Sequence, residues 1–320
     1  ILTSSMNALK WLSELQVDLT DKIDDIKEIL KIKTSKTRNN KSIMDLTTNM
    51  QRLQNLKGKV DLVTDSWTES EYVHTKDREG ITFMPLKVNN LAKRLFDYAD
   101  QVILMSATII DPDNFCKSLG ITDYQYVEAE SSFDAKKAPI VCNPKYKLNY
   151  HLMEKNLPKV IRQVAEICKH HGADKGIIHT HNNTITAKLS HMLYGDRFLY
   201  REPGIKNEDI LDQHMLSADP TVLVSPSMSY GVDLKGDLAK FQIIIKAPFL
   251  PTKDVRIEKL MKADFSWYQN KMLCSLIQSC GRGIRSTEDE CITYILDGTI
   301  VENIVRAKHK LPKYFLERFA

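Results

Sequence analysis

The segment Thr221-Val-Leu-Val-Ser-Pro-Ser-Met-Ser-Tyr-Gly-Val-Asp233, with Phe241-Gln-Ile-Ile-Ile245 shortly after it, decides the fold class. It begins and ends with short, mainly apolar runs. Such runs are typical of strands buried on both faces of a parallel sheet. The hydroxyl-rich loop follows the carboxyl end of the first run, where open α/β sheets bind ligands. Taken alone, this loop favours a plain turn, so its interpretation depends on the sequence around it.

Strands and helices alternate on both sides of that segment. We expect further strands over 176–180, 198–200 and 292–296, and helices over 157–170, 184–194, 208–216 and 266–280. Alternation of this kind predicts a parallel sheet covered by helices, an α/β fold. The strand at 176–180 leads into His179-Thr-His181, whose two histidines point to the same side because strand side chains alternate.

The first 66 residues predict an α-helical hairpin instead. Apolar residues recur at steps of three and four in two stripes, from Leu9 to Leu30 and from Leu46 to Val60. Between the stripes lies a polar tip whose basic residues include Lys33, Lys36, Arg38 and Lys41. A solvated tip is the favoured interpretation, and an arm that contacts phosphates is the alternative.

From Val60 onwards, short β-prone runs appear and are followed by one helix. The runs lie at 60–63, 71–73 and 81–83, and the helix is expected over 88–98. Next comes the apolar run Val102-Ile-Leu-Met105, which predicts a buried parallel strand that ends in Ser106-Ala-Thr108. This region also contains the aromatic residues Trp67, Tyr72 and Phe83. We expect them to pack in a small sheet, and stacking on nucleic-acid bases is the alternative.

The octapeptide Gln278-Ser-Cys-Gly-Arg-Gly-Ile-Arg285 follows the last expected long helix. If the helix continues, spacings of four and three residues place Gln278, Arg282 and Arg285 on one face. Glycine costs about 1 kcal/mol in a helix, so the two glycines indicate that something approaches the backbone closely. A nucleotide is one candidate for that group.

Composition sets wide limits on function. The 320 residues carry a net charge of +4, so a basic footprint for nucleic acid has to be local. Six dispersed cysteines form no C-x-x-C pair, which indicates neither a disulfide framework nor a metal site and favours a reducing compartment, cytoplasmic or nuclear. No apolar run has the length of a membrane span. Because the chain opens on Ile1 rather than Met, we expect it to be the interior and carboxyl end of a longer protein.

The order of these pieces resembles motifs III to VI of superfamily 2 helicases. Ser106-Ala-Thr108, the strand ending in His179-Thr-His181, the loop 225–234 and the octapeptide follow one another as those motifs do. The strings MPLKVNNLAKRLFDYADQVILMSATI, ESSFD, SYGVDLKGDLAKFQIIIKAPFLP and GRGIR are similar to the DinG/XPD branch. The resemblance implies an Arch-like hairpin (1–66), the carboxyl end of a first RecA-like domain (67–130) and a second RecA-like domain (131–320).

The resemblance also implies roles for single residues. Catalysis falls to Arg282, Arg285 and Gln278, and nucleotide binding to Gly231, Asp233 and Gly281. Ser106 and Thr108 couple the nucleotide to nucleic acid. Contacts to nucleic acid are implied for His179, His181, Ser225 and Ser227, with the basic tip residues as further candidates. For the two histidines, a purely structural role is an equal alternative.

The departures from the family pattern concern the nucleotide site. No G-x-x-x-x-G-K-[ST] loop and no Asp-Glu-x-His occurs in the sequence, so ATP and Mg²⁺ are expected to bind mostly to an amino-terminal part of the same protein. An iron–sulfur cluster is possible only there. Tyr230 replaces a usual Glu, and Asp297-Gly-Thr299 a usual Asp-x-Arg. We expect a fragment of an ATP-dependent 5′→3′ DNA helicase that binds single-stranded DNA, with a non-catalytic scaffold subunit or an RNA helicase as alternatives.

Overall fold

The computed structural model describes residues 5–36, 40–67, 72–76, 78, 80–201, 204–226 and 234–319. The chain divides into two compact units. The first comprises Ile1–Val102 with Lys117–Thr122, and the second comprises Ile103–Cys116 with Asp123–Ala320. The predicted domain boundaries at residues 66 and 130 stay predictions.

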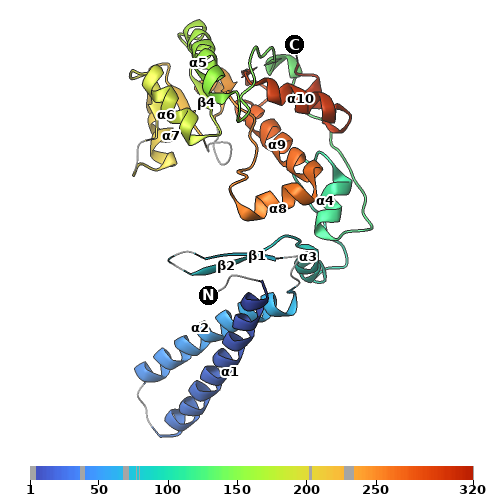
Figure 1. Cartoon of the computed structure of the whole chain (residues 1–320). Coiled ribbons are helices and arrows are strands. Elements are labelled where there is room, and N and C mark those ends of the chain that lie inside the picture. Colours follow the sequence, from blue (N-terminus) through green and yellow to red (C-terminus); the bar gives the residue numbers. More distant parts are fainter. Residues whose placement is uncertain are drawn as a thin grey trace. The chain divides into compact units, whose positions relative to one another are not determined.

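The first unit begins with the predicted helical hairpin, made of α1 (Ser5–Lys36) and α2 (Asn40–Asp65), which lie side by side (Figure 1). Leu12, Leu19 and Val60 are buried between them. The β-prone run 60–63 is helical, so its prediction as a strand was wrong. Val60 continues the apolar stripe of α2, and packing against α1 overrides the preference of valine for strands.

A small antiparallel sheet and a helix complete this unit. The sheet pairs β1 (Tyr72–Lys76) with β2 (Ile81–Pro85), and the helix is α3 (Asn89–Phe96). Trp67 stacks on Tyr72 with ring centroids 5.4 Å apart and meets Phe83 edge-on at 5.9 Å. Trp67 thus packs against both other rings, which confirms the packing interpretation.

The second unit contains a six-stranded, wholly parallel sheet in the order β3-β8-β7-β4-β6-β5. Its strands are β3 (Ile140–Val141), β4 (Gly176–His179), β5 (Phe198–Tyr200), β6 (Val222–Ser225), β7 (Phe241–Ile244) and β8 (Ile292–Ile295). Both runs of the opening segment became inner strands, β6 and β7. The predicted α/β fold is confirmed.

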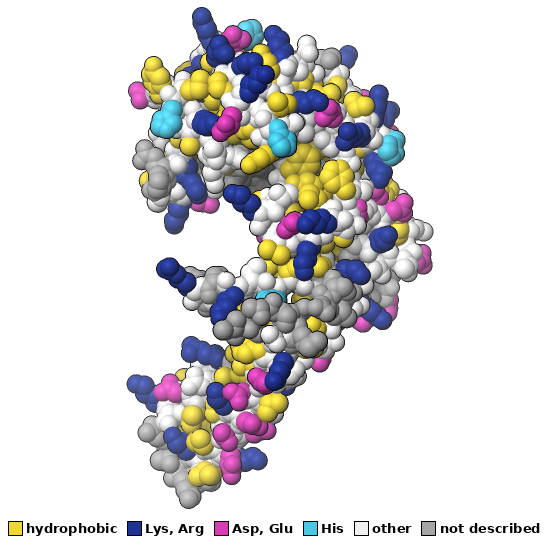
Figure 2. Space-filling view, in the orientation of Figure 1, with side chains coloured by type: hydrophobic (Ala, Val, Ile, Leu, Met, Phe, Trp, Pro, Cys, Tyr) yellow, Lys and Arg dark blue, Asp and Glu magenta, His cyan; other side chains and the backbone are white. Residues whose placement is uncertain are grey.

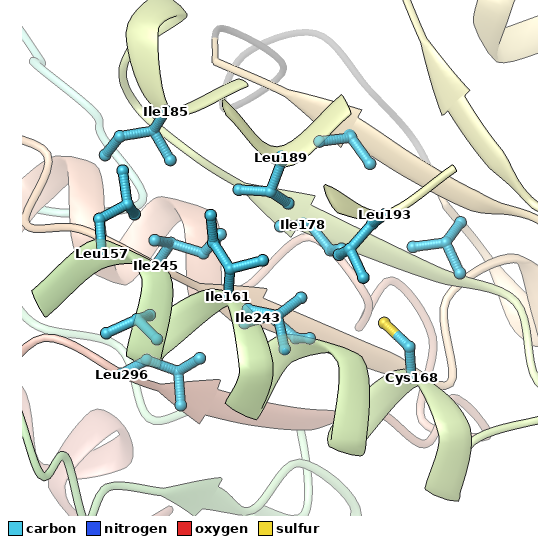
Figure 3. Close-up of a cluster of buried hydrophobic side chains, with 14 of the residues drawn as sticks. Leu157, Ile161, Cys168, Ile178, Ile185, Leu189, Leu193, Ile243, Ile245 and Leu296 are labelled. Atoms are coloured by element: carbon cyan, nitrogen blue, oxygen red, sulfur yellow. The ribbon is translucent and has the colours of Figure 1, made fainter. Parts of the chain in front are cut away.

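Helices cover both faces of this sheet (Figure 1). They are α5 (Met153–His170), α6 (Asn183–Met192), α7 (Asn207–Leu216), α9 (Phe265–Cys280) and α10 (Gly298–Ala307). Shorter helices are α4 (Pro112–Leu119), α8 (Val255–Ala263) and α11 (Lys313–Leu316). One core joins α5 and α6 to Ile178 and Ile243, as Figure 3 shows, and another joins α9 and α10 to Ile244. Successive strand residues thus enter opposite cores, which explains why these strands are mainly apolar.

The run Val102–Met105 is not a strand, contrary to prediction. Its four residues are 39–90% exposed, and no strand of the described residues pairs with it. A strand needs a neighbour to satisfy its backbone hydrogen bonds, so an apolar run alone does not suffice. The run continues directly into Ser106-Ala-Thr108, which belongs to the second unit.

Candidate functional site

The octapeptide lies at the end of α9 and in the loop that follows. The helix ends at Cys280, and Gly281 caps it with its N–H donating to the carbonyl oxygen of Ile277 (3.0 Å). Arg282 and Arg285 therefore lie in a turn, and the prediction that they share a helical face with Gln278 was wrong. Apolar side chains anchor this segment, because Leu273, Leu276 and Cys280 are fully buried and Ile284 is 9% exposed.

The two glycines of this loop differ in what surrounds them. A Cβ on Gly283 would lie 2.3 Å from Cys291 Sγ and 3.1 Å from the Ala239 carbonyl oxygen. At Gly281 the nearest atoms would be at 3.6 Å, an ordinary contact. The close approach predicted at the glycines thus occurs at Gly283, and the approaching groups are Cys291 and Ala239 rather than a nucleotide.

Asp289 fixes the far end of the loop. One carboxylate oxygen accepts hydrogen bonds from the amides of Arg285 and Ser286, both at 2.6 Å, and the other accepts from the Gly236 amide at 3.0 Å. Burial alone would raise the pKa of Asp289, but these donors outweigh it and hold the pKa below its ordinary value. The carboxylate thereby ties the arginine loop to the segment after the loop 227–233.

A cavity of about 480 Å³ opens beside this loop, within the second unit. The octapeptide supplies Gln278, Gly281, Arg282, Ile284 and Arg285 to its wall. Ile277, directly before the octapeptide, also lines the cavity. Residues far away in sequence complete the wall; they are Ala107, Thr108, Ala129, Ser131, Phe133, Asp134, Ala135, Ala138, Tyr314 and Arg318. Five of the predicted site residues therefore meet at one place, namely Gln278, Gly281, Arg282, Arg285 and Thr108.

Backbone contacts hold the Ser106-Ala-Thr108 segment at the cavity. The Tyr314 hydroxyl donates to the Ala107 carbonyl oxygen (3.4 Å), and the Cys274 thiol lies 3.9 Å from the Thr108 carbonyl oxygen. Thr108 is 8% exposed and lines the cavity. Ser106 is exposed, and its hydroxyl oxygen accepts from the Thr108 amide (3.2 Å). Of the segment predicted to couple the nucleotide to nucleic acid, Ala107 and Thr108 therefore line the cavity and Ser106 does not.

His179 and His181 lie at the carboxyl end of β4 and do not line the cavity. Their rings stack with centroids 5.8 Å apart, and His179 is 1% exposed. Burial lowers the pKa of His179 to about 3 and that of His181 to about 4, with neighbouring positive charge adding to it. Both rings are therefore neutral at pH 7. Ser225 pairs with His179 in the sheet and is also buried.

Several predicted residues lie outside the described part of the chain. They are Ser227, Gly231, Asp233 and Arg38, together with the side chain of Lys36. Of the remaining hairpin-tip residues, Lys33 donates to the Ser42 hydroxyl (2.8 Å), and Lys41 is exposed. Figure 2 shows acidic and basic side chains mixed along the visible face of α1 and α2.

Five important residues escaped sequence reasoning. Phe133 and Asp134 lie in the string ESSFD, which indicates only the family resemblance, and they line the cavity. Tyr314, Arg318 and Asp289 carried no recognisable pattern. The only sequence signal for Asp289 is its position four residues after Arg285, from which a carboxylate can accept hydrogen bonds from the amides of the loop.

The arrangement suits a phosphorylated ligand. Three arginines and one aspartate, Asp134, are the charged residues in the wall, and Asp134 caps a short turn by accepting from the Lys136 amide (2.9 Å). The volume falls within the roughly 300–1,000 Å³ of small-molecule pockets. Guanidinium groups bind phosphate oxygens bidentately. No group of three or more His, Cys, Asp or Glu residues that could hold a metal occurs among the described residues.

Comparison with known proteins identifies this class of fold. Residues 159–317 match the family "Helicase C-terminal domain". The chain is 22% identical over 326 aligned residues to the ATP-dependent DNA helicase YoaA of Haemophilus influenzae, an alignment that covers 93% of the chain and 47% of that protein. The structure is also similar to two solved XPD structures. One, an XPD helicase, has a TM-score of 0.58 at 15% identity and is matched over 92% of this chain and 55% of its own.

The other, an apo form of XPD, has a TM-score of 0.59 at 14% identity, over 85% of this chain and 61% of its own. The second unit is RecA-like, its residues 159–317 match a helicase C-terminal domain, and the chain is similar to the helicase YoaA and to XPD. It spans about half the length of the relatives that it matches. No described helix is both long enough and apolar enough to cross a membrane.

Proposed function

We propose that this chain is part of an ATP-dependent DNA helicase that moves 5′→3′ along single-stranded DNA. The observation that carries the proposal is the convergence of Arg282, Arg285, Gln278 and Thr108 on one cavity. Their order along the chain resembles helicase motifs, and their positions in space now agree with a shared task. DNA as the substrate is supported by the name of the relative YoaA, a DNA helicase.

The cavity offers charge to a transferring phosphoryl group. In the transition state, negative charge is spread over the oxygens of that group, and the protein has little covalent chemistry to perform. Catalysis therefore depends on positioned cations. Arg282 and Arg285 supply two planar guanidinium groups, which are permanently charged. Asp289 holds the Arg285 backbone by a 2.6 Å hydrogen bond, which limits how far this arginine can drift. Gln278, one turn earlier on α9, adds a neutral hydrogen-bonding group.

In this proposal, another part of the protein supplies the remainder of the nucleotide site. A phosphate loop and carboxylates for Mg²⁺ are absent from the sequence, so another part of the protein would hold ATP and its metal. Thr108 and Ser106 would then connect the cavity wall to the DNA-binding surface. The described residues alone provide cations for phosphates but no carboxylate cluster for Mg²⁺.

An ATPase assay on the 320-residue chain tests this division. Purified alone, the chain is expected to hydrolyse no ATP above background, with or without single-stranded DNA. A longer protein from the same gene, carrying a phosphate loop, is expected to show turnover that DNA stimulates. Stimulated turnover by the chain alone would refute the division, and a gene without a phosphate loop would favour a non-catalytic scaffold. Stimulation by RNA alone would assign an RNA helicase.

A further inference from the structure

Arg318 lies in the cavity wall near the end of the chain, just after α11. The side chain is 9% exposed. Its Nε donates to the Ala138 carbonyl oxygen (2.6 Å), and its Nη2 donates to the Cys280 carbonyl oxygen (3.0 Å), with the Thr293 hydroxyl at 3.5 Å. Cys280 is the last residue of α9, directly before the loop that carries Arg282. The guanidinium is thus fixed beside the arginine loop.

The charge of Arg318 is not neutralised by its surroundings. Its hydrogen-bond partners are two carbonyl oxygens and a hydroxyl, and no described carboxylate lies within ion-pair distance. Two buried thiols lie close enough to feel it, Cys280 and Cys291, but burial raises the pKa of each to about 12, so both stay protonated. A buried cation without an anion is costly unless a ligand supplies one.

One end of the guanidinium remains available for such a ligand. Among the described residues, Nη1 has no hydrogen-bond partner, while Nε and Nη2 are occupied. Arg197 provides the contrast within the same unit. All three of its nitrogens donate to carbonyl oxygens, those of Pro220, Cys168, His171 and Asp174, and it does not line the cavity. Arg197 has the hydrogen bonding of a structural arginine, and Arg318 does not.

We propose that Arg318 is a third phosphate-binding arginine of this cavity, which contacts a phosphate oxygen of the nucleotide through Nη1. The proposal rests on the proposed function for the identity of the ligand as a nucleotide. Nε and Nη2 hold the guanidinium in place before the ligand arrives, so little side-chain freedom is lost on binding. With Arg282 and Arg285, the cavity then presents three cations to a polyphosphate.

Binding of inorganic triphosphate to the 320-residue chain tests this without any hydrolysis. Calorimetric titration at low salt compares the unmodified chain with Arg318→Gln and Arg197→Gln. Glutamine keeps two N–H donors for the carbonyl oxygens but removes the charge. Because charge-assisted hydrogen bonds are the strong ones, Arg318→Gln is expected to weaken binding about ten-fold or more. Arg197→Gln is expected to change it by less than about two-fold, whatever its cost in stability.

Hydrogen exchange on the unmodified chain keeps the proposal falsifiable if Arg318→Gln does not fold. The Ile140 amide donates to the Arg318 carbonyl oxygen (2.6 Å), so it reports whether the carboxyl-terminal segment stays in place. Triphosphate is expected to slow exchange at Ile140 and across 311–319, since a ligand stabilises the state that it binds. Unchanged exchange there, or equal affinity in Arg318→Gln, would overturn the proposal.

Two further results separate this inference from the proposed function. Slower exchange with an oligothymidylate but not with triphosphate would overturn the assignment to a nucleotide and point to DNA phosphates. Equal triphosphate binding by Arg318→Gln, together with DNA-stimulated ATP turnover in the longer protein, would remove Arg318 from the site and leave the helicase function standing.

Discussion

Replacing Asp289 by asparagine is expected to destabilise the second unit and release the arginine loop. The carboxylate is 3% exposed and accepts three backbone N–H groups. Asparagine offers one acceptor oxygen, so its NH₂ group must face at least one of these donors. An unsatisfied buried donor costs roughly 1–3 kcal/mol, and the remaining bonds lose their charge assistance. We therefore expect a loss of about 3 kcal/mol in the free energy of unfolding.

Hydrogen exchange of the β7 and β8 amides measures this loss in the second unit alone. Asp196→Asn is the matched control, because Asp196 is exposed in the same unit and its replacement is expected to cost less than about 0.5 kcal/mol. The pKa of Asp289 is lowered on folding, so its stabilising effect is present above the unfolded pKa of about 4 and fades as the pH falls below it. Equal losses in Asp289→Asn and Asp196→Asn at pH 7 would refute this role of Asp289.

Three other predictions follow from the structure and sequence. The first replaces the four basic tip residues Lys33, Lys36, Arg38 and Lys41 by serine. The slope of log affinity for single-stranded DNA against log salt concentration should become flatter by about 0.7 per lost phosphate contact. An unchanged slope would favour the interpretation as a solvated tip. His179 is protonated below about pH 6.5 in the unfolded chain but only near pH 3 in the folded chain. Between these pH values, its protonation should lower the free energy of unfolding by up to about 1.4 kcal/mol for each pH unit of acidification. In chemical denaturation His179→Gln should reduce the measured slope by this share and leave the share of His181, whereas His191→Gln, at an exposed position, should leave the slope unchanged. Gly283→Ala should cost about 1–3 kcal/mol through its clash with Cys291, whereas Gly281→Ala should melt within a few degrees of the parent.

The sheet of the second unit was predictable because each inner strand is buried on both faces. Apolar runs such as Val222–Val224 and Phe241–Ile244 occur between amphipathic helices, so local pattern and tertiary packing agree. The same rule failed at Val102–Met105, where the run is apolar but no described strand lies beside it. An apolar run shows that a strand can be buried there, whereas its pairing depends on a neighbour that local sequence does not reveal.

The candidate site was predictable only in part. Gln278, Arg282 and Arg285 line one cavity, and the end of the helix at Cys280 was predicted correctly, but the spacing of the two arginines imitates a helical face that the structure does not form. Arg318 was invisible because its contact with Ala138 joins residues 180 positions apart. Contacts of that range depend on the folded chain as a whole, and no local periodicity records them.

Steady-state ATPase activity of Arg282→Lys and Arg285→Lys, measured in the longer protein at saturating single-stranded DNA, tests the central claim most directly. Lysine keeps the charge but loses the planar fork that bridges two phosphate oxygens. Arginine fingers are worth about 10³ to 10⁵ in rate, so each variant is expected to lose more than about ten-fold in turnover, with unchanged DNA affinity and melting temperature. Near-normal turnover in both folded variants would contradict the claim that this arginine loop meets the phosphates of ATP.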